Sequence, residues 1–248
     1  MISYNFISKE NENNLIKYQY KGRDNSILYN YVFGPIAESF QTQYKQNDQI
    51  NIFNINIIIL KLTLCGYLCV IIPHLVLWYM FPNELSGNIP RSLCAFIGIM
   101  HLIYMNFDNV DGKQARKTGN SSPLGLLFDH GCDALVVSVQ GISLAACMGF
   151  GNTYNSYLVY ASGAIPFFIT TIDEYYNDFM YLPWINGASE GCLAVGLFIL
   201  FSAAFGPQWW GEEIVFGQTK RQVTLYFFLF AGIVTSLNIF KKKYVLEI

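Results

Sequence analysis

Six apolar segments constrain this chain more than any other feature of its sequence. They occupy residues 57–81, 92–107, 124–150, 157–171, 191–205 and 223–240. Because the core of a bilayer offers the backbone no water to bond with, a segment that crosses it must be helical. Several segments are shorter than the roughly 20 residues of a perpendicular span, so we expect their helices to extend into polar flanks. The sequence predicts an all-α integral membrane protein, a bundle of about six transmembrane helices whose fourth and fifth segments are the weakest.

The charge content agrees with this interpretation. Only 13% of the residues are charged, whereas 53% are hydrophobic and 17% are aromatic. Soluble domains carry roughly twice that charged share. A net charge of −2 provides no broad basic surface, so we expect no nucleic-acid partner. The six cysteines lie in or beside apolar segments at spacings that fit no zinc site, and we interpret them as small buried residues.

The first fifty residues differ from the rest of the chain. They are polar, rich in Asn, Gln and Tyr, and contain no apolar run of membrane length, so we expect no cleavable signal. The stretch from Leu15 to Leu28, with Tyr31 and Pro35 after it, mixes aromatic and charged residues, as an interfacial helix does. We therefore expect two parts: a polar segment at 1–50 with an interfacial helix, and a six-helix membrane domain at 51–248.

The distribution of lysine and arginine predicts the orientation of the helices. Eleven of these residues lie before the first apolar segment, between the second and third, or after the sixth. Only three, Arg91, Lys220 and Arg221, fall on the opposite side. Because positively charged loops remain in the cytoplasm, both termini and the loop between the second and third segments are predicted to face it.

Four aspartates surround that same loop. Asp108 and Asp111 are one helical turn apart, and Asp129 and Asp133 are separated by another turn. Carboxylates on adjacent helices can enclose a small space, but like charges cannot share it unless cations neutralise them. Oxygen ligands alone favour a hard ion, Mg²⁺ or Mn²⁺, over zinc. The sequence therefore predicts a metal centre with one or two ions.

The alternative is that these aspartates cap helices or lie in a solvated loop. For Asp108 and Asp111 that alternative is serious. It is weaker for Asp129 and Asp133, because they lie inside a run from Leu124 to Phe150 that is otherwise almost uncharged. Carboxylates within membrane segments are usually functional.

The aspartates belong to a longer pattern, Asp-x-x-Asp-Gly-x-x-Ala-Arg, then eight residues, then Gly-x-x-x-Asp-x-x-x-Asp. Its fixed positions are Asp108, Asp111, Gly112, Ala115, Arg116, Gly125, Asp129 and Asp133. This pattern resembles the signature of the CDP-alcohol phosphotransferases, and fixed residues at fixed spacing make it a specific one. The neighbouring sequences FDHGCD and NGASEG are similar to those of the eukaryotic choline/ethanolamine phosphotransferase branch.

The resemblance implies transfer of a phosphoalcohol from CDP-choline or CDP-ethanolamine to diacylglycerol, with release of CMP. It implies a set of metal-binding carboxylates: Asp108, Asp111, Asp129 and Asp133. It implies a set of positions that bind the donor: Gly112, Ala115, Arg116 and Gly125. Asp133 is the family's usual general base, and Glu174 is a second candidate. The enzyme would work among membrane lipids of the endoplasmic reticulum or Golgi, with the mitochondrial inner membrane as the alternative.

Some features depart from the branch. Leu126 stands where a glutamate often follows the motif glycine, and the stretch from Phe53 to Ile57 lacks the usual Pro-Asn-x-x-Thr pattern. The branch also continues through further spans. The resemblance therefore covers about residues 15–210 of this chain but not the C-terminal part of the branch.

A different class of function stays open. The chain can be a structural subunit of a larger membrane assembly, with weak or no activity, or it can form a homodimer. Its 17 tyrosines and 20 phenylalanines suit contacts with partners. The complete aspartate pattern argues for the enzyme instead, because loss of activity removes the constraint on metal-binding carboxylates.

Overall fold

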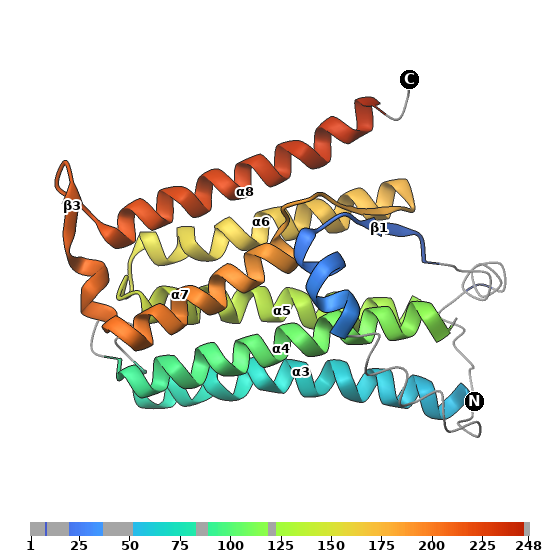
Figure 1. Ribbon diagram of the computed structural model, residues 1–248, viewed down its shortest axis with the longest axis horizontal. Coiled ribbons are helices and arrows are strands. Elements are labelled where there is room, and N and C mark those ends of the chain that lie inside the picture. Colours follow the sequence, from blue (N-terminus) through green and yellow to red (C-terminus); the bar gives the residue numbers. More distant parts are fainter. Residues whose placement is uncertain (1–7, 9–19, 37–51, 83–88, 119–122, 246–248) are drawn as a thin grey trace.

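The computed structural model describes residues 8, 20–36, 52–82, 89–118 and 123–245. Six long helices dominate these ranges and form a bundle (Figure 1). They are α3 (Ile52–Met80), α4 (Arg91–Thr118), α5 (Pro123–Cys147), α6 (Tyr154–Asn177), α7 (Cys192–Phe205) and α8 (Lys220–Val245). Each of the six predicted apolar segments falls on one of these helices, and the predicted all-α membrane fold is confirmed.

The helices differ in how well they suit a bilayer. Among the described residues, five helical segments are long and apolar enough to cross a membrane: 61–80, 91–110, 123–147, 187–205 and 220–240. The helix that does not meet this criterion is α6, which contains the fourth apolar segment. Its 24 residues correspond to roughly 36 Å, which exceeds the thickness of a bilayer core. It packs against both α5 and α8.

The bundle has two distinct ends. We call the end where α4 finishes and α5 begins the motif end, and the opposite end the far end. In Figure 1, α3 begins and α8 finishes at the motif end. Because α3 to α8 are six helices that alternate in direction, the first begins and the last finishes at the same end.

The larger apolar cluster lies at the far end. It comprises fifteen buried residues, among them Leu77, Leu93, Leu144, Ile199 and Trp210. The smaller cluster lies nearer the motif end and comprises Cys69, Val70, Tyr104 and Val136. Among the side chains that the structure describes, more of the buried apolar ones therefore belong to the cluster at the far end.

A parallel strand pair ties the N-terminal segment to the loop after α6. Strand β1 (Gly22–Asp24) pairs with β2 (Met180–Leu182), with Gly22 opposite Met180. Asp178, with φ of 49°, ends α6 in a left-handed turn just before β2. The short π-helical turn η2 (Gly187–Gly191) then leads into α7.

The helix of the N-terminal segment lies later in the sequence than the interfacial helix that was predicted there. Residues 27–36 are helical around the π-turn η1 (Tyr29–Phe33), and this helix packs on α4. Residues 22–24 form β1 instead of helix, because β2 supplies partners for the backbone there: Met180 N donates to Lys21 O at 2.9 Å and Asn25 N to Leu182 O at 3.0 Å. Residues 15–19 of the predicted stretch lie outside the described residues.

The far end is closed by short elements between α7 and α8. A 3₁₀ turn, η3 (Pro207–Gly211), precedes a hairpin of β3 (Glu213–Val215) and β4 (Gln218–Thr219). The two turn residues, Phe216 and Gly217, both have positive φ, which matches the twist of a tight hairpin.

Candidate metal and catalytic site

The antiparallel helices α4 and α5 bring three of the four predicted aspartates together at the motif end. Asp108, near the end of α4, and Asp129 and Asp133, in the first half of α5, each offer one carboxylate oxygen, and these oxygens lie within 4.8 Å of one another. All three side chains are partly buried. The backbone of α4 continues through Asp111, but the side chain of Asp111 lies outside the described part of the structure.

This donor set fits a divalent cation. Oxygen ligands lie about 2.0–2.6 Å from Mg²⁺ or Ca²⁺, so two oxygens on one ion are separated by at most roughly 4–5 Å. The three aspartate oxygens satisfy that limit. Partly buried carboxylates at this density repel one another, and a bound cation removes the repulsion. The aspartates can therefore hold a divalent metal, as the sequence predicts.

Tyr104 supports Asp133 from the neighbouring helix. Its hydroxyl donates a hydrogen bond to Asp133 Oδ1 at 2.9 Å. Tyr104 lies one turn before Asp108 on α4 and is buried, with 6% of its surface exposed. Tyr104 was not among the predicted site residues. Its spacing of four from Asp108, which places both on one face of α4, was the signal that could have indicated it. The bond limits the rotation of the Asp133 carboxylate.

A small hollow reaches the aspartates from the side of α3. It touches Asp108 and Asp133, and its other lining residues are Thr63, Gly66, Tyr67, Tyr104 and Cys132. The hollow therefore joins a polar site to the apolar surroundings of α3, α4 and α5.

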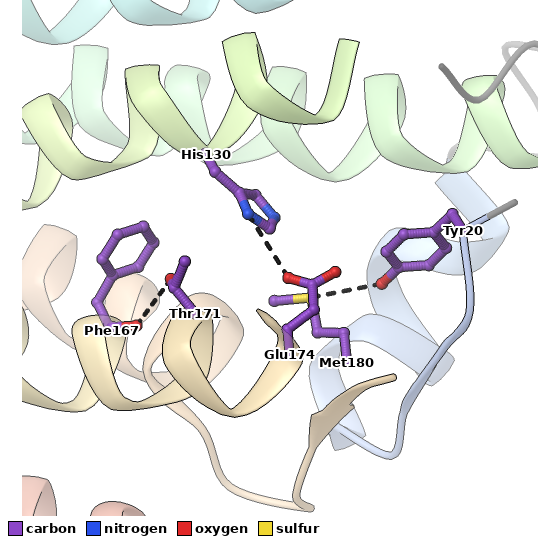
Figure 2. Close-up of polar contacts among 6 residues, drawn as sticks. All are labelled: Tyr20, His130, Phe167, Thr171, Glu174 and Met180. Atoms are coloured by element: carbon purple, nitrogen blue, oxygen red, sulfur yellow. Dashed lines mark hydrogen bonds and ion pairs between the residues drawn. The ribbon is translucent and has the colours of Figure 1, made fainter. Parts of the chain in front are cut away.

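Glu174 faces His130 across the space between α6 and α5. Figure 2 shows the two side chains pointing towards each other, and His130 Nδ1 lies 3.6 Å from Glu174 Oε2. Both side chains are largely buried, with 17% of His130 and 12% of Glu174 exposed. His130 follows Asp129 directly in α5, and its side chain points towards α6 (Figure 2). This histidine is thus a partner for Glu174, which the sequence proposed as a second catalytic carboxylate.

The predicted donor-binding positions lie on the same two helices. Gly112 continues α4 one turn beyond Asp108, and Gly125 lies in the first turn of α5; both are partly exposed. Ala115 and Arg116 are in the last turns of α4, and their side chains lie outside the described residues.

Comparison with known proteins resolves the family. The profile of the CDP-alcohol phosphatidyltransferase family matches residues 60–234, most of the chain. The chain belongs to this family. The resemblance stated from the aspartate pattern is therefore confirmed.

Individual relatives share the family. The chain is 34% identical to choline/ethanolaminephosphotransferase 1 of Arabidopsis thaliana over 200 residues, which cover 81% of this chain and 48% of the relative. It is 34% identical over 205 residues to an uncharacterized CDP-alcohol phosphatidyltransferase class-I family protein 3 of Dictyostelium discoideum, covering 82% and 49%. Choline/ethanolaminephosphotransferase 1 of Saccharomyces cerevisiae is 29% identical over 203 residues, covering 82% and 49%. The chain spans about half the length of the curated relatives it matches.

The region of this chain that matches the family profile contains the aspartates, Tyr104, His130 and Glu174. Its first residue, Leu60, lies inside α3, so the family profile does not include β1 or the helix at 27–36. The match to the family profile therefore says nothing about the contacts of this N-terminal segment.

Proposed function

We propose that this chain transfers phosphocholine or phosphoethanolamine from a CDP-alcohol to diacylglycerol and releases CMP. The observation that carries the proposal is the set of aspartate oxygens within 4.8 Å on α4 and α5, in a chain of the CDP-alcohol phosphatidyltransferase family. The names of the Arabidopsis and yeast relatives support these head groups and the role in phospholipid synthesis.

Binding of the donor requires that the negative charge of its pyrophosphate be offset. A divalent cation, Mg²⁺ or Mn²⁺, supplies that offset when bound, and we propose Asp108, Asp111 and Asp129 as its main ligands, with Asp133 beside them. Arg116 offers two parallel N–H donors to phosphate oxygens, which a lysine cannot match. Gly112, Ala115 and Gly125 have little or no side chain, so the nucleotide can approach the helix backbone there.

The acceptor hydroxyl must lose its proton as its oxygen attacks the β-phosphorus and the bond to CMP breaks. Asp133 and Glu174 are the candidate bases. Asp133 already accepts a hydrogen bond from Tyr104 and lies among the metal-binding carboxylates. Glu174 is paired with a histidine that can pass a proton onwards. We therefore favour Glu174 as the base and assign Asp133 to the metal centre.

The membrane supplies the second substrate. We propose that diacylglycerol reaches the aspartates laterally, because its acyl chains keep it within the bilayer. By the distribution of positive charge the motif end faces the cytoplasm, where CDP-alcohols are soluble. The endoplasmic reticulum or Golgi is the proposed location, and the mitochondrial inner membrane is the alternative.

One assay tests the function. The purified chain, in mixed micelles with diacylglycerol, is incubated with radiolabelled CDP-choline or CDP-ethanolamine and Mg²⁺. We expect labelled lipid and an equal amount of CMP from at least one donor, and neither product with Asp129→Asn. If the wild-type chain neither binds nor turns over either donor, the proposal fails and the structural-subunit function replaces it.

A further inference from the structure

A buried polar network joins the N-terminal segment to the loop before α7. Glu190 lies at its centre, and both carboxylate oxygens are in use. Its Oε1 accepts hydrogen bonds from Ser26 Oγ at 2.8 Å and Leu28 N at 3.2 Å, and its Oε2 accepts one from Asn186 N at 3.1 Å. All of these donors are neutral. A carboxylate whose two oxygens both accept hydrogen bonds is suited to hold two segments together.

The same network caps a helix. The hydroxyl of Ser26 accepts from Tyr29 N at 3.0 Å, while Glu190 accepts from Leu28 N. These backbone N–H groups belong to the start of the helix at 27–36, where a negative charge is favourable. Ser26 is completely buried and Asn186 is 3% exposed, so a lost bond would not be replaced by water. Glu190 therefore docks residues 24–28 firmly onto the turn that begins α7.

From that turn, contacts lead to the metal centre. Cys192, two residues after Glu190, accepts a hydrogen bond at its carbonyl oxygen from His101 Nε2 at 2.7 Å. The ring centroid of His101 lies 6.2 Å from that of Tyr104. Tyr104 in turn donates to Asp133. The network at Glu190 and the aspartates are thus the two ends of one series of adjacent groups.

The packing around His101 leaves little freedom in this series. His101 is 2% exposed. Gly196, one turn beyond Cys192 on α7, lies so close that a Cβ there would be 2.9 Å from His101 Cδ2. Close-packed interiors pass on a displacement because there is no void to absorb it. A shift of the first turn of α7 must therefore move His101.

We propose that Glu190 is a positioning residue for the metal centre. By docking residues 24–28 onto the start of α7, it fixes α7 against His101, and this contact sets the orientation of the Tyr104–Asp133 pair. The inference rests on the proposed function only in one respect, that the aspartates bind a divalent cation. Turnover of a CDP-alcohol is not part of it.

Binding of Mn²⁺ to the purified full chain, measured from the electron paramagnetic resonance signal of the free ion, tests the proposal without any turnover. Glu190→Gln keeps the size of the side chain but sets amide donors against neighbouring donors. Changes along such networks alter coupled equilibria by roughly 2- to 30-fold. We expect Mn²⁺ affinity to fall about 3- to 10-fold in Glu190→Gln and about 2-fold in Ser26→Ala.

Two control variants lie away from the network. Glu212→Gln removes the partner of Lys220 at the far end. Ser236→Ala removes a hydroxyl that bonds only to its own helix, at Gly232 O. Both should bind Mn²⁺ as the wild type does. Cleavage by trypsin after Arg23, followed by mass spectrometry, reports the docking of β1 independently and should accelerate in Glu190→Gln and Ser26→Ala alone.

A double-mutant cycle tests the route. Tyr104→Phe removes the hydrogen bond to Asp133 and should itself weaken Mn²⁺ binding. If Glu190 acts through Tyr104, Glu190→Gln adds little in the Tyr104→Phe background, whereas independent effects multiply. Multiplying effects would overturn the proposal, as would faster cleavage after Arg23 with unchanged Mn²⁺ affinity.

The remaining outcomes are equally decisive. If Glu190→Gln does not fold, Ser26→Ala carries the same test, because it leaves the Leu28 and Asn186 bonds to Glu190 in place. A wild-type chain that binds no Mn²⁺ overturns the proposal. A wild-type chain that binds Mn²⁺ but turns over no CDP-alcohol defeats the proposed function alone.

Discussion

The two ends of the bundle place their charges in opposite ways. At the far end, Arg91 donates to Phe205 O at 2.9 Å and Arg221 donates to Gly149 O. These carbonyls lie at the C-terminal ends of α7 and α5, where a cation offsets the helix dipole. At the motif end, Asp108, Asp129 and Asp133 gather on one site instead, like charge beside like charge.

The apolar core follows the same division. The far end contains the fifteen-residue cluster, in which Trp210 is 3% exposed and donates its indole N–H to Ser202 Oγ at 2.8 Å. Within the described part of the chain, the cluster near the aspartates has four buried members. Real proteins depart from stable packing mainly where they function. We infer that the far end supplies stability and the motif end supplies chemistry, and each prediction below can break that division.

The largest effect is expected from loss of the metal centre. Excess EDTA should reduce transfer activity to background, and Mg²⁺ or Mn²⁺ should restore it, because the carboxylates need a hard cation. Asp129→Asn should be equally inactive, yet its unfolding temperature in detergent should equal or exceed that of the wild type, since it removes a like charge. Activity that survives EDTA, or a large loss of stability in Asp129→Asn, would contradict the division.

The next effect separates the two candidate bases. Glu174→Gln should lower kcat by roughly 10²–10⁴ with little change in KM, because an amide cannot take the hydroxyl proton. Its Mn²⁺ affinity should be unchanged. Asp133→Asn should lower both kcat and Mn²⁺ affinity. If Asp133→Asn keeps its Mn²⁺ affinity and Glu174→Gln keeps its kcat, the roles are reversed and Asp133 is the base.

A smaller effect is expected at Arg116. Arg116→Lys loses the paired N–H donors to phosphate, so the KM for the CDP-alcohol should rise about tenfold while kcat changes little. The matched control is Arg221→Lys at the far end, which should leave the KM unchanged. Steady-state kinetics with varied donor and saturating diacylglycerol measure both, and equal effects of the two changes would refute the role of Arg116.

The smallest effect on activity is expected at the far end itself. Ser202→Ala leaves the buried indole N–H of Trp210 without its acceptor, which costs about 1–3 kcal/mol of stability. Thermal unfolding in detergent should detect this loss, while kcat and KM per folded molecule stay at their wild-type values. A changed KM would show that the two ends are coupled through the bundle.

Sequence analysis identified the helices and the aspartates because both signals are local. Apolar length alone located α3, α5 and α8, and spacings of three and four placed the aspartates on helix faces. It did not identify Tyr104, because the bond to Asp133 depends on how α4 and α5 meet. The pairing of His130 with Glu174 was not predicted either, because the two residues are more than forty positions apart in the sequence.

The N-terminal segment shows the limit of local patterns more sharply. A mixture of aromatic and charged residues between Leu15 and Leu28 suits an interfacial helix, but residues 22–24 form a strand because β2 offers free backbone partners. Nothing near Ser26 in the sequence indicates Glu190. Contacts of this kind depend on the packing of the intervening helices, which no pattern within one segment contains.

The pairing of β1 with β2 also has a consequence for biosynthesis. Tyr20 and Met180, which bond to each other in this region (Figure 2), are 160 residues apart. At the usual pace of a ribosome, about 5–20 residues per second, roughly 8–30 s pass before the partner strand has been made. During that interval α3 to α6 are synthesised while the N-terminal segment waits undocked. A chaperone that shields the undocked segment would therefore act before α7 has been synthesised.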